Sequence, residues 1–256
     1  MLKNLIQVAF RNFKKDKWYS LLNILGLTIG MTFSLFLIFY IRDELTFDRF
    51  NINADRIYRI NSYIQEKDKN TNWAITQYPL AQAMQREFPE VEQAVRFNGR
   101  ERTLFKQGNH EFYETKVYYA DSNVFNVFTA RFLEGNPAKA LYEPYSIVIS
   151  RTLADKYFGR NTPAFGKTLR TVYDLYKVTG VIEDLPRNTH FRYDMLISMN
   201  SIKNQNNGGQ NWGNFGYFTY VLLKPNANPA AVTKKLVQTC KKYVEPIFSQ
   251  FNIKMY

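Results

Sequence analysis

The clearest pattern in the chain is an unbroken apolar run near its beginning. Residues 21–41, LLNILGLTIGMTFSLFLIFYI, contain no charged side chain. A helix of this length rises about 31 Å, the thickness of the hydrocarbon core of a bilayer. Trp18 and Tyr19 precede the run and Tyr40 lies at its end, and such rings favour the membrane interface. The pattern predicts a transmembrane helix over residues 18–41, because the run is too long for a signal peptide and no cleavage site follows it.

Ahead of this run, apolar positions recur with helical spacing. They are Leu2, Leu5, Ile6, Ala9, Phe10 and Phe13. Lys3, Gln7, Arg11, Lys14 and Lys15 lie elsewhere on such a helix. The pattern predicts an amphipathic helix within residues 1–17 that lies in the inner membrane interface, with Phe10 and Phe13 toward the lipid. An ordinary basic tail is the alternative. Because basic residues dominate residues 1–17 and not the segment after the run, we expect a cytoplasmic N-terminus and an extracytoplasmic domain over residues 42–256.

One face of the predicted span carries small residues. Gly26, Gly30 and Ser34 recur every four residues, and Asn23 adds a polar group. Small residues at this spacing let a second helix approach closely. No second apolar run of sufficient length follows residue 41. We therefore expect either oligomerisation through this helix or a chain that is the front portion of a longer protein.

The remainder of the chain predicts an α+β domain, with mixed or antiparallel sheets and short packing helices. Period-two runs bounded by Gly, Asn and Pro predict strands, and runs with helical spacing predict short helices. The expected strands cover residues 55–65, 91–97, 102–108, 112–120, 145–150, 171–182, 191–199 and 217–224. The expected helices cover 78–88, 122–128 with Ser122 as its cap, 150–159 between Ser150 and Gly159, and 228–248 starting at Pro229.

Composition argues against several function classes. The net charge is +12, but no nucleic-acid-binding signature accompanies it, and on the outer side of a membrane basic residues meet lipid or proteins. Cys240 is the single cysteine and falls on the expected inward face of the last helix. His110 and His190 lie far apart without metal-ligand spacing, so we expect turn or surface roles. We predict no catalytic residue, no metal and no cofactor.

The stretch GRNTPAFGKTLRTV, residues 159–172, superficially resembles a phosphate-binding loop. Such a loop needs four residues between its glycines and a helix after its lysine. Here six residues separate Gly159 from Gly166, and a strand-like sequence follows Lys167. The stretch therefore predicts a turn between a helix and a hairpin.

Three motifs together resemble a known family. VAFRNFKKDKWYSLLNILGLTIG at the start, ISRTLADKYFG followed by GKTL, and the strand and turn VTGVIEDLP are similar to FtsX-like ABC transporter permeases with a MacB-type periplasmic core domain. The resemblance covers essentially the whole chain. It implies that Gly-Lys-Thr is the turn of that domain, and that ATP is hydrolysed by a separate polypeptide.

The resemblance also implies partners and a location. Such permeases lie in the inner, or plasma, membrane, form a homodimer or pair with a second permease half, and bind cytoplasmic ABC ATPase subunits. Their outer domains move in export, in lipoprotein extraction or in control of wall hydrolases, with a periplasmic adaptor or a lipoprotein as further partner. Membrane lipid is a further expected contact, and nucleic acid is not.

The sequence departs from the family in one respect. Family members carry further spans after the outer domain, whereas this sequence stops at Tyr256, so we expect a fragment or a truncated product. The alternative function is a single-pass anchored sensor or protein-interaction domain. An anchored enzyme acting on the cell envelope is the third possibility.

Overall fold

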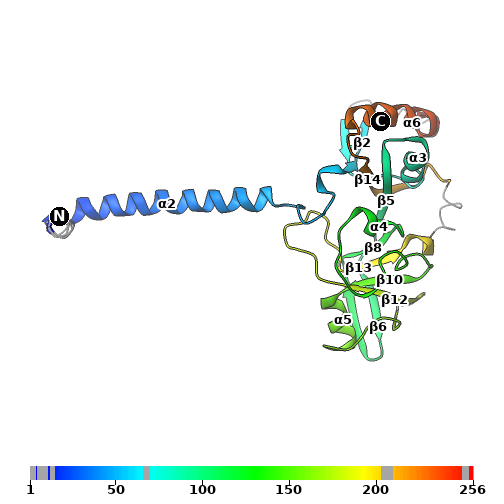
Figure 1. The fold of residues 1–256 in the computed structure, drawn as a ribbon, viewed down its shortest axis with the longest axis horizontal. Helices are drawn as coiled ribbons and strands as arrows, with labels where there is room; N and C mark the ends of the chain where they lie inside the picture. The colour runs from blue at the N-terminus through cyan, green and yellow to red at the C-terminus, as the bar shows by residue number, and fades with distance from the viewer. Residues whose placement is uncertain are drawn as a thin grey trace. The chain divides into compact units, whose positions relative to one another are not determined.

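The structure, a computed structural model, describes residues 4, 11, 15–65, 70–202, 210–249 and 254–255. It consists of two compact units, Met1–Phe47 and Asp48–Tyr256 (Figure 1). The second unit is called the sheet domain below.

The first unit contains helix α2, Lys17–Leu45, of 29 residues. None of its side chains is buried, and it is the one helix among the described residues that is long and apolar enough to cross a membrane. The long apolar helix that the sequence predicts is therefore present, and it continues past Ile41. The membrane boundaries at residues 18 and 41 remain predictions. Phe10 and Phe13 of the predicted interfacial helix lie outside the described residues.

The sheet domain is built on a mixed sheet of 12 strands. Ten of them follow the order β1-β14-β5-β8-β13-β10-β12-β11-β6-β7, with β4 beside β14 and β9 beside β12. Their bounds are Ile57–Ile60 (β1), Thr76–Gln77 (β4), Val91–Gly99 (β5), Thr103–Gln107 (β6), His110–Glu114 (β7), Val117–Ala120 (β8), Phe132–Gly135 (β9), Ser146–Ser150 (β10), Thr168–Arg170 (β11), Leu175–Ile182 (β12), Met195–Ser198 (β13) and Phe215–Leu223 (β14). β10 runs parallel to β12, and β8 parallel to β13. A second sheet pairs Ser62–Gln65 (β2) with Asn70–Trp73 (β3) and Lys254–Met255 (β15).

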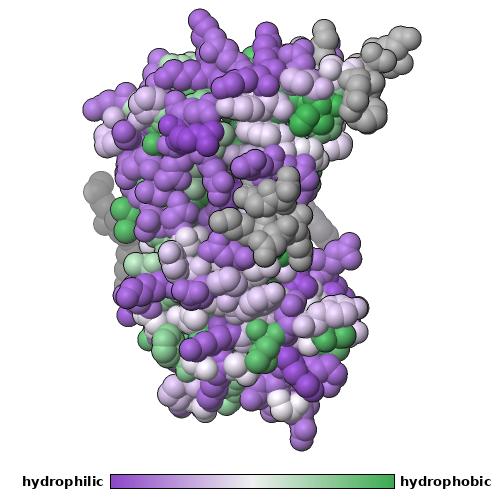
Figure 2. All heavy atoms as spheres, turned by 90° about the vertical axis from the view of Figure 1, so that its right-hand side faces the viewer, coloured by the Kyte–Doolittle hydropathy of each residue, from purple (hydrophilic) through white to green (hydrophobic). Residues whose placement is uncertain are grey.

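The helices lie at different places along the sheet (Figure 1). Their bounds are Leu80–Glu87 (α3), Val124–Val127 (α4), Arg151–Phe158 (α5), Pro229–Tyr243 (α6) and Glu245–Phe248 (α7), with 3₁₀ turns η1 at Ala54–Arg56 and η2 at Met199–Ile202. α3 packs on β5 and β14, and α5 packs on β10 and β12. The α+β class with a mixed sheet is therefore confirmed. Figure 2 shows a face of the sheet domain on which hydrophilic residues dominate and hydrophobic ones are scattered, as expected when the apolar side chains fill the core.

Local chemistry explains the ends of α5 and α6. The hydroxyl of Ser150 accepts a hydrogen bond from the Leu153 amide, and Gly159 ends α5 at φ 89°, a conformation that glycine adopts without strain. Asn228 caps α6 through the Ala230 amide, and Pro229 occupies its first turn. The caps at Ser150 and Gly159 and the proline start are confirmed.

Several expected elements differ in the structure. The predicted strand 55–65 is divided between β1 and β2, which belong to different sheets, and 112–120 is divided between β7 and β8. The predicted helix 228–248 breaks at Val244. α4 exists, but Asn123 and not Ser122 precedes it, and no side chain caps it. These divisions depend on which distant strand each half pairs with, which a local pattern of alternating residues does not contain.

A buried ion pair joins β5 to the loop after β8. Arg96 is 2% exposed, and its Nε and Nη2 atoms donate to the two carboxylate oxygens of Asp121 at 2.9 and 2.6 Å. Its Nη1 atom donates to the backbone oxygen of Tyr78 at 2.7 Å, and the guanidinium lies 4.1 Å from the centre of the Tyr78 ring. Because its donors are satisfied by Asp121 and Tyr78, Arg96 is accommodated in the core.

Candidate functional site

The Gly-Lys-Thr stretch forms a turn, as its spacing predicts. α5 ends at Phe158, and the next element along the chain is strand β11, which begins at Thr168. A strand and not a helix therefore follows Lys167. The amides of Ala164 and Phe165 donate to the Oε2 atom of Glu134, at 2.9 and 2.8 Å. The turn therefore does bind an anion, but that anion is a carboxylate of the protein itself. These amides are not available to a phosphate.

The predicted helix-packing residues lie along one shallow groove of α2. Gly26, Gly30 and Ser34 line it together with Leu27, Met31 and Leu35. Apart from the backbone of the helix itself and the neighbouring residues, no atom lies within 4 Å of the position that a Cβ atom would take at Gly26 or Gly30. The Ser34 hydroxyl donates to the Gly30 backbone oxygen at 2.9 Å. Asn23 is on the same helix and exposed, and its packing role stays a prediction together with those of the other three.

The predicted interface aromatic residues also lie on α2. Trp18 and Tyr19 follow its first residue, Tyr40 lies toward its other end, and all three are exposed, at 84%, 71% and 62%. Their position at the two ends of the apolar run agrees with the spacing read from the sequence. Their contact with lipid headgroups remains a prediction.

The sheet domain contains a cluster that the sequence did not indicate. Asp48, the first residue of the domain, adopts a left-handed conformation, φ 59°. Its Oδ1 atom accepts hydrogen bonds from the Thr189 hydroxyl at 2.7 Å and from the His190 amide at 3.2 Å. Its Oδ2 atom lies 2.5 Å from Nδ1 of His190. We call this group, with Tyr220 described next, the Asp48 latch.

Tyr220 completes the latch from strand β14. Its hydroxyl lies 2.9 Å from Nε2 of His190, so the imidazole bridges Asp48 and Tyr220. Burial raises the pKa of Tyr220 to about 12, against an opposing effect from the nearby Arg59. The phenol is therefore neutral at physiological pH and acts as a hydrogen-bonding group.

A second contact holds the same segment. The side-chain oxygen of Asn51 accepts from the Thr129 amide at 3.0 Å, and the Thr129 hydroxyl accepts from the Ile52 amide at 2.9 Å. Asp48 and Asn51 thus fix the residues that enter the domain to two separate loops. Asn51 is buried, at 6% exposed.

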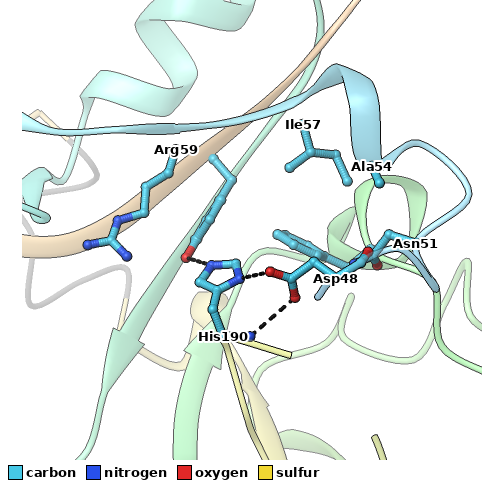
Figure 3. Close-up of a pocket in the computed structure, with 8 residues that line it drawn as sticks. Asp48, Asn51, Ala54, Ile57, Arg59 and His190 are labelled. Carbon is cyan, nitrogen blue, oxygen red and sulfur yellow. Dashed lines mark hydrogen bonds and ion pairs between the residues drawn. The ribbon is translucent and has the colours of Figure 1, made fainter. Parts of the chain in front are cut away.

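The latch borders a small cavity of about 190 Å³. Figure 3 shows His190 pointing toward Asp48, with Arg59 and Ile57 of β1 across the cavity. The lining residues are Asp48, Asn51, Ala54, Ile57, Arg59, Phe128, His190 and Tyr220. The cavity is too small for a drug-sized ligand, for which pockets measure roughly 300–1,000 Å³.

The chemistry of the latch is structural. A carboxylate beside an imidazole resembles half of a general-base arrangement, but the second imidazole nitrogen meets a phenol whose pKa is raised and not lowered. Among the described residues no group of three His, Cys, Asp or Glu side chains could hold a metal ion. His110 is exposed, as expected of a surface histidine. The latch was not predictable because Asp48 and His190 are 142 residues apart.

Comparisons with known proteins agree with this architecture. Residues 20–239 match the family of the "MacB-like periplasmic core domain". A domain of a putative permease from Porphyromonas gingivalis is similar in structure, with a TM-score of 0.71 and 24% identity over 80% of this chain and 89% of that one. No curated protein matches significantly.

Two further solved structures share the fold. The periplasmic region of MacB from Actinobacillus actinomycetemcomitans gives a TM-score of 0.52 at 12% identity, over 77% of this chain and 87% of that one. The extracellular domain of the noncanonic ABC-type transporter YknZ from Gram-positive bacteria gives 0.54 at 14% identity, over 78% of this chain and 100% of that one. At such identities the likeness concerns the fold alone.

Proposed function

Because the chain belongs to the family of MacB-like periplasmic core domains, we propose that it acts as the permease subunit of an ABC transporter. In this proposal a separate cytoplasmic ATPase hydrolyses ATP, and the resulting motion of the membrane helices displaces the extracytoplasmic sheet domain. The displacement serves export or lipoprotein and envelope mechanotransmission. The chain lies in the inner membrane with its N-terminus in the cytoplasm, as a homodimer or paired with a second permease half.

One observation carries the proposal. The family match begins inside the apolar helix, at residue 20, and continues through the sheet domain to residue 239. The helix and the domain therefore belong to one family unit, and the helix is not an unrelated anchor.

The Asp48 latch supports a coupling role. Asp48 follows Leu45, the last residue of α2, by three positions in the sequence. The latch fixes the start of the domain to β14 through Tyr220 and to the loop before β13 through Thr189 and His190. A displacement of the chain at residue 48 would therefore be passed to the sheet through these hydrogen bonds.

The experiment tests assembly through the small-residue face of α2. The tagged chain is purified in mild detergent from the membranes of cells that produce it naturally, and co-purified proteins are identified by mass spectrometry. We expect an ABC ATPase and a permease half. The variant Gly26→Leu with Gly30→Leu should lose both, because two leucines fill the groove. Thr28→Leu with Thr32→Leu places two leucines on the opposite face of the helix and should retain both.

Each outcome has a distinct meaning. A glycine variant that assembles like the wild type contradicts the packing role of Gly26 and Gly30. A wild-type chain that never co-purifies with an ATPase contradicts transport and favours the anchored sensor or interaction domain. Limited proteolysis of the sheet domain should be unchanged in all variants, since α2 is a separate unit.

A further inference from the structure

One end of the large sheet has two unlike faces. In β12, β11 and β6 the side chains of Tyr176, Leu169 and Phe105 are fully buried, in the core that also contains residues of α5. The alternate residues at this end of the strands, Leu104 and Lys106 of β6, Thr168 and Arg170 of β11, and Leu175 and Lys177 of β12, are exposed or half-exposed. This end of the sheet is therefore covered on one face, and the other face is open among the described residues (Figure 1).

The strand register shows that the exposed residues are neighbours. Arg170 lies opposite Leu175 on one side and opposite Lys106 on the other. Leu104 lies opposite Tyr113 in the adjoining hairpin. Opposite residues on antiparallel strands share a face with their Cβ atoms about 5 Å apart. We call this surface the open sheet face; it comprises Leu104, Lys106, Glu111, Tyr113, Thr168, Arg170, Leu175 and Lys177.

The hairpin between β11 and β12 adds an apolar tip beside this face. Val172 is 74% exposed and Tyr173 is 90% exposed. The turn beneath them is well connected, because the Thr171 amide donates to the Asp174 backbone oxygen at 2.8 Å and the Asp174 amide donates to the Thr171 hydroxyl at 3.1 Å. Two apolar side chains are thus held in water on a defined turn, next to the exposed Leu175, and contiguous apolar surface of this kind marks interaction sites.

Positive charge predominates on the open sheet face. Glu111 pairs with Lys106 at 2.6 Å, whereas Arg102, Arg170 and Lys177 form no ion pair within the described part of the chain. Arg102 instead lies 4.2 Å from the centre of the Tyr113 ring. A second copy of this chain would present the same positive charge to the same face, so charge repulsion disfavours self-association there.

We propose that the open sheet face and the Val172–Tyr173 tip form a docking surface for an acidic partner protein. The mixture of Arg, Tyr and Leu is typical of the central residues of protein interfaces. The basic side chains are spread over a flat sheet and do not converge on a pocket, as recognition of a single phosphate group would require. The inference does not depend on transport, since an anchored interaction domain would use the surface equally.

A binding experiment tests the surface directly. The full chain is reconstituted in nanodiscs of uncharged phosphatidylcholine, and the probe is a fluorescein-labelled peptide of alternating Glu and Leu, read by anisotropy. Arg170→Glu with Lys177→Glu should weaken binding at least roughly ten-fold, because two attractive charges become repulsive. Lys234→Glu with Lys241→Glu changes the same net charge on exposed positions of α6 and should leave binding within about two-fold.

Apolar contact and partner identity are tested separately. Val172→Ser with Tyr173→Ser keeps every charge and should weaken binding of the same peptide several-fold. A photo-crosslinking amino acid at position 173, in the full chain in its own membrane, should then form an adduct with an acidic protein, and Arg170→Glu with Lys177→Glu should abolish that adduct. Unchanged near-UV circular dichroism in every variant shows that the sheet domain has kept its packing.

Several results would overturn the proposal. The first is that the acidic peptide does not bind, and the second is that the α6 control variant loses as much binding as Arg170→Glu with Lys177→Glu. The third is that a peptide with Lys in place of Glu binds as tightly, and the last is that the crosslinker at position 173 forms an adduct only with lipid or with a second copy of the chain. The first three remove charge complementarity as the basis of docking. The last assigns the surface to the membrane or to self-association.

Discussion

Substitutions of Asp48 test the latch most sharply. Asp48→Ala removes the acceptor of three donors, at 2.7, 3.2 and 2.5 Å, and places alanine at φ 59°. Hydrogen bonds to a charged group contribute roughly 1.5–3 kcal/mol each when buried, but the Asp48 side chain is 29% exposed and that of His190 37%. We therefore expect Asp48→Ala to lower the stability of the latch by about 2–3 kcal/mol through loss of the carboxylate, and by roughly 1 kcal/mol more through the strained backbone.

Two other substitutions separate these contributions. Asp48→Gly removes the carboxylate without backbone strain, so its loss should be smaller than that of alanine by about 1 kcal/mol. Asp48→Asn keeps an Oδ1 acceptor for Thr189 and for the His190 amide, and asparagine tolerates a positive φ. Its loss should be the smallest, about 1 kcal/mol.

Hydrogen exchange of the full chain in detergent micelles measures the effect locally. If the free energy needed to open the latch falls by about 2 kcal/mol, the amides that it protects exchange roughly 30-fold faster. We expect faster exchange in peptides covering residues 48–56 and 187–191, with the largest increase in the Ala variant, a smaller one in the Gly variant and the smallest in the Asn variant. Exchange in β10 should not change. Equal exchange in all three variants, or faster exchange that extends to β10, would refute the latch as a local connection.

Three further predictions concern stability, each measured on the full chain. Asp121→Ala should lower the free energy of unfolding in urea by roughly 3–5 kcal/mol, because Arg96 stays buried without its carboxylate; adding Arg96→Met should recover part of this, and simple additivity would contradict the pairing. Gly135→Ala should lower Tm strongly, since the new Cβ atom would lie 2.3 Å from the Thr179 backbone oxygen, and a wild-type Tm would show that β9 packs differently. Burial raises the pKa of Cys240 from 9.0 to about 11 and that of Tyr220 from 10.0 to about 12. The folded state then binds more protons than the unfolded state, so stability should fall as pH rises from about 9 to 12, by roughly 2–3 kcal/mol per group; Cys240→Ala should remove the fall between about pH 9 and 10, where unfolded tyrosine is still protonated, and an identical pH profile would refute that assignment.

The sequence predicted those elements that are determined by residues close together in the chain. The apolar run gives α2, and Ser150 and Gly159 give both ends of α5. The spacing of Gly159 and Gly166 correctly argued against a nucleotide loop. It did not reveal that Glu134 occupies the loop amides, because this carboxylate comes from β9, a strand that the sequence did not predict.

Features made by distant residues were not predictable. β9 is a short run ending in glycine, and it becomes a strand only because Gly135 can lie against Gly180 of β12. The latch requires Asp48 and His190, which are 142 residues apart in the sequence. In both cases the partner is chosen by tertiary packing, which no pattern within ten or twenty residues contains.

The continuous ladder of the large sheet has a mechanical consequence. Hydrogen-bonded neighbours join β1, the strand after the latch, to β6 and β7 through every intermediate strand. From β1 to β11, neighbouring strands share several paired residues, so sliding one strand past another would break several backbone hydrogen bonds together and this part of the sheet is stiff. β11 meets β6 through the single pair Arg170 and Lys106. The sheet from β1 to β11 should therefore turn as a stiff lever, and a small rotation at β1 becomes a larger displacement at the hairpin between β11 and β12. Spin labels at the two ends would keep one narrow distance distribution while the lever turns.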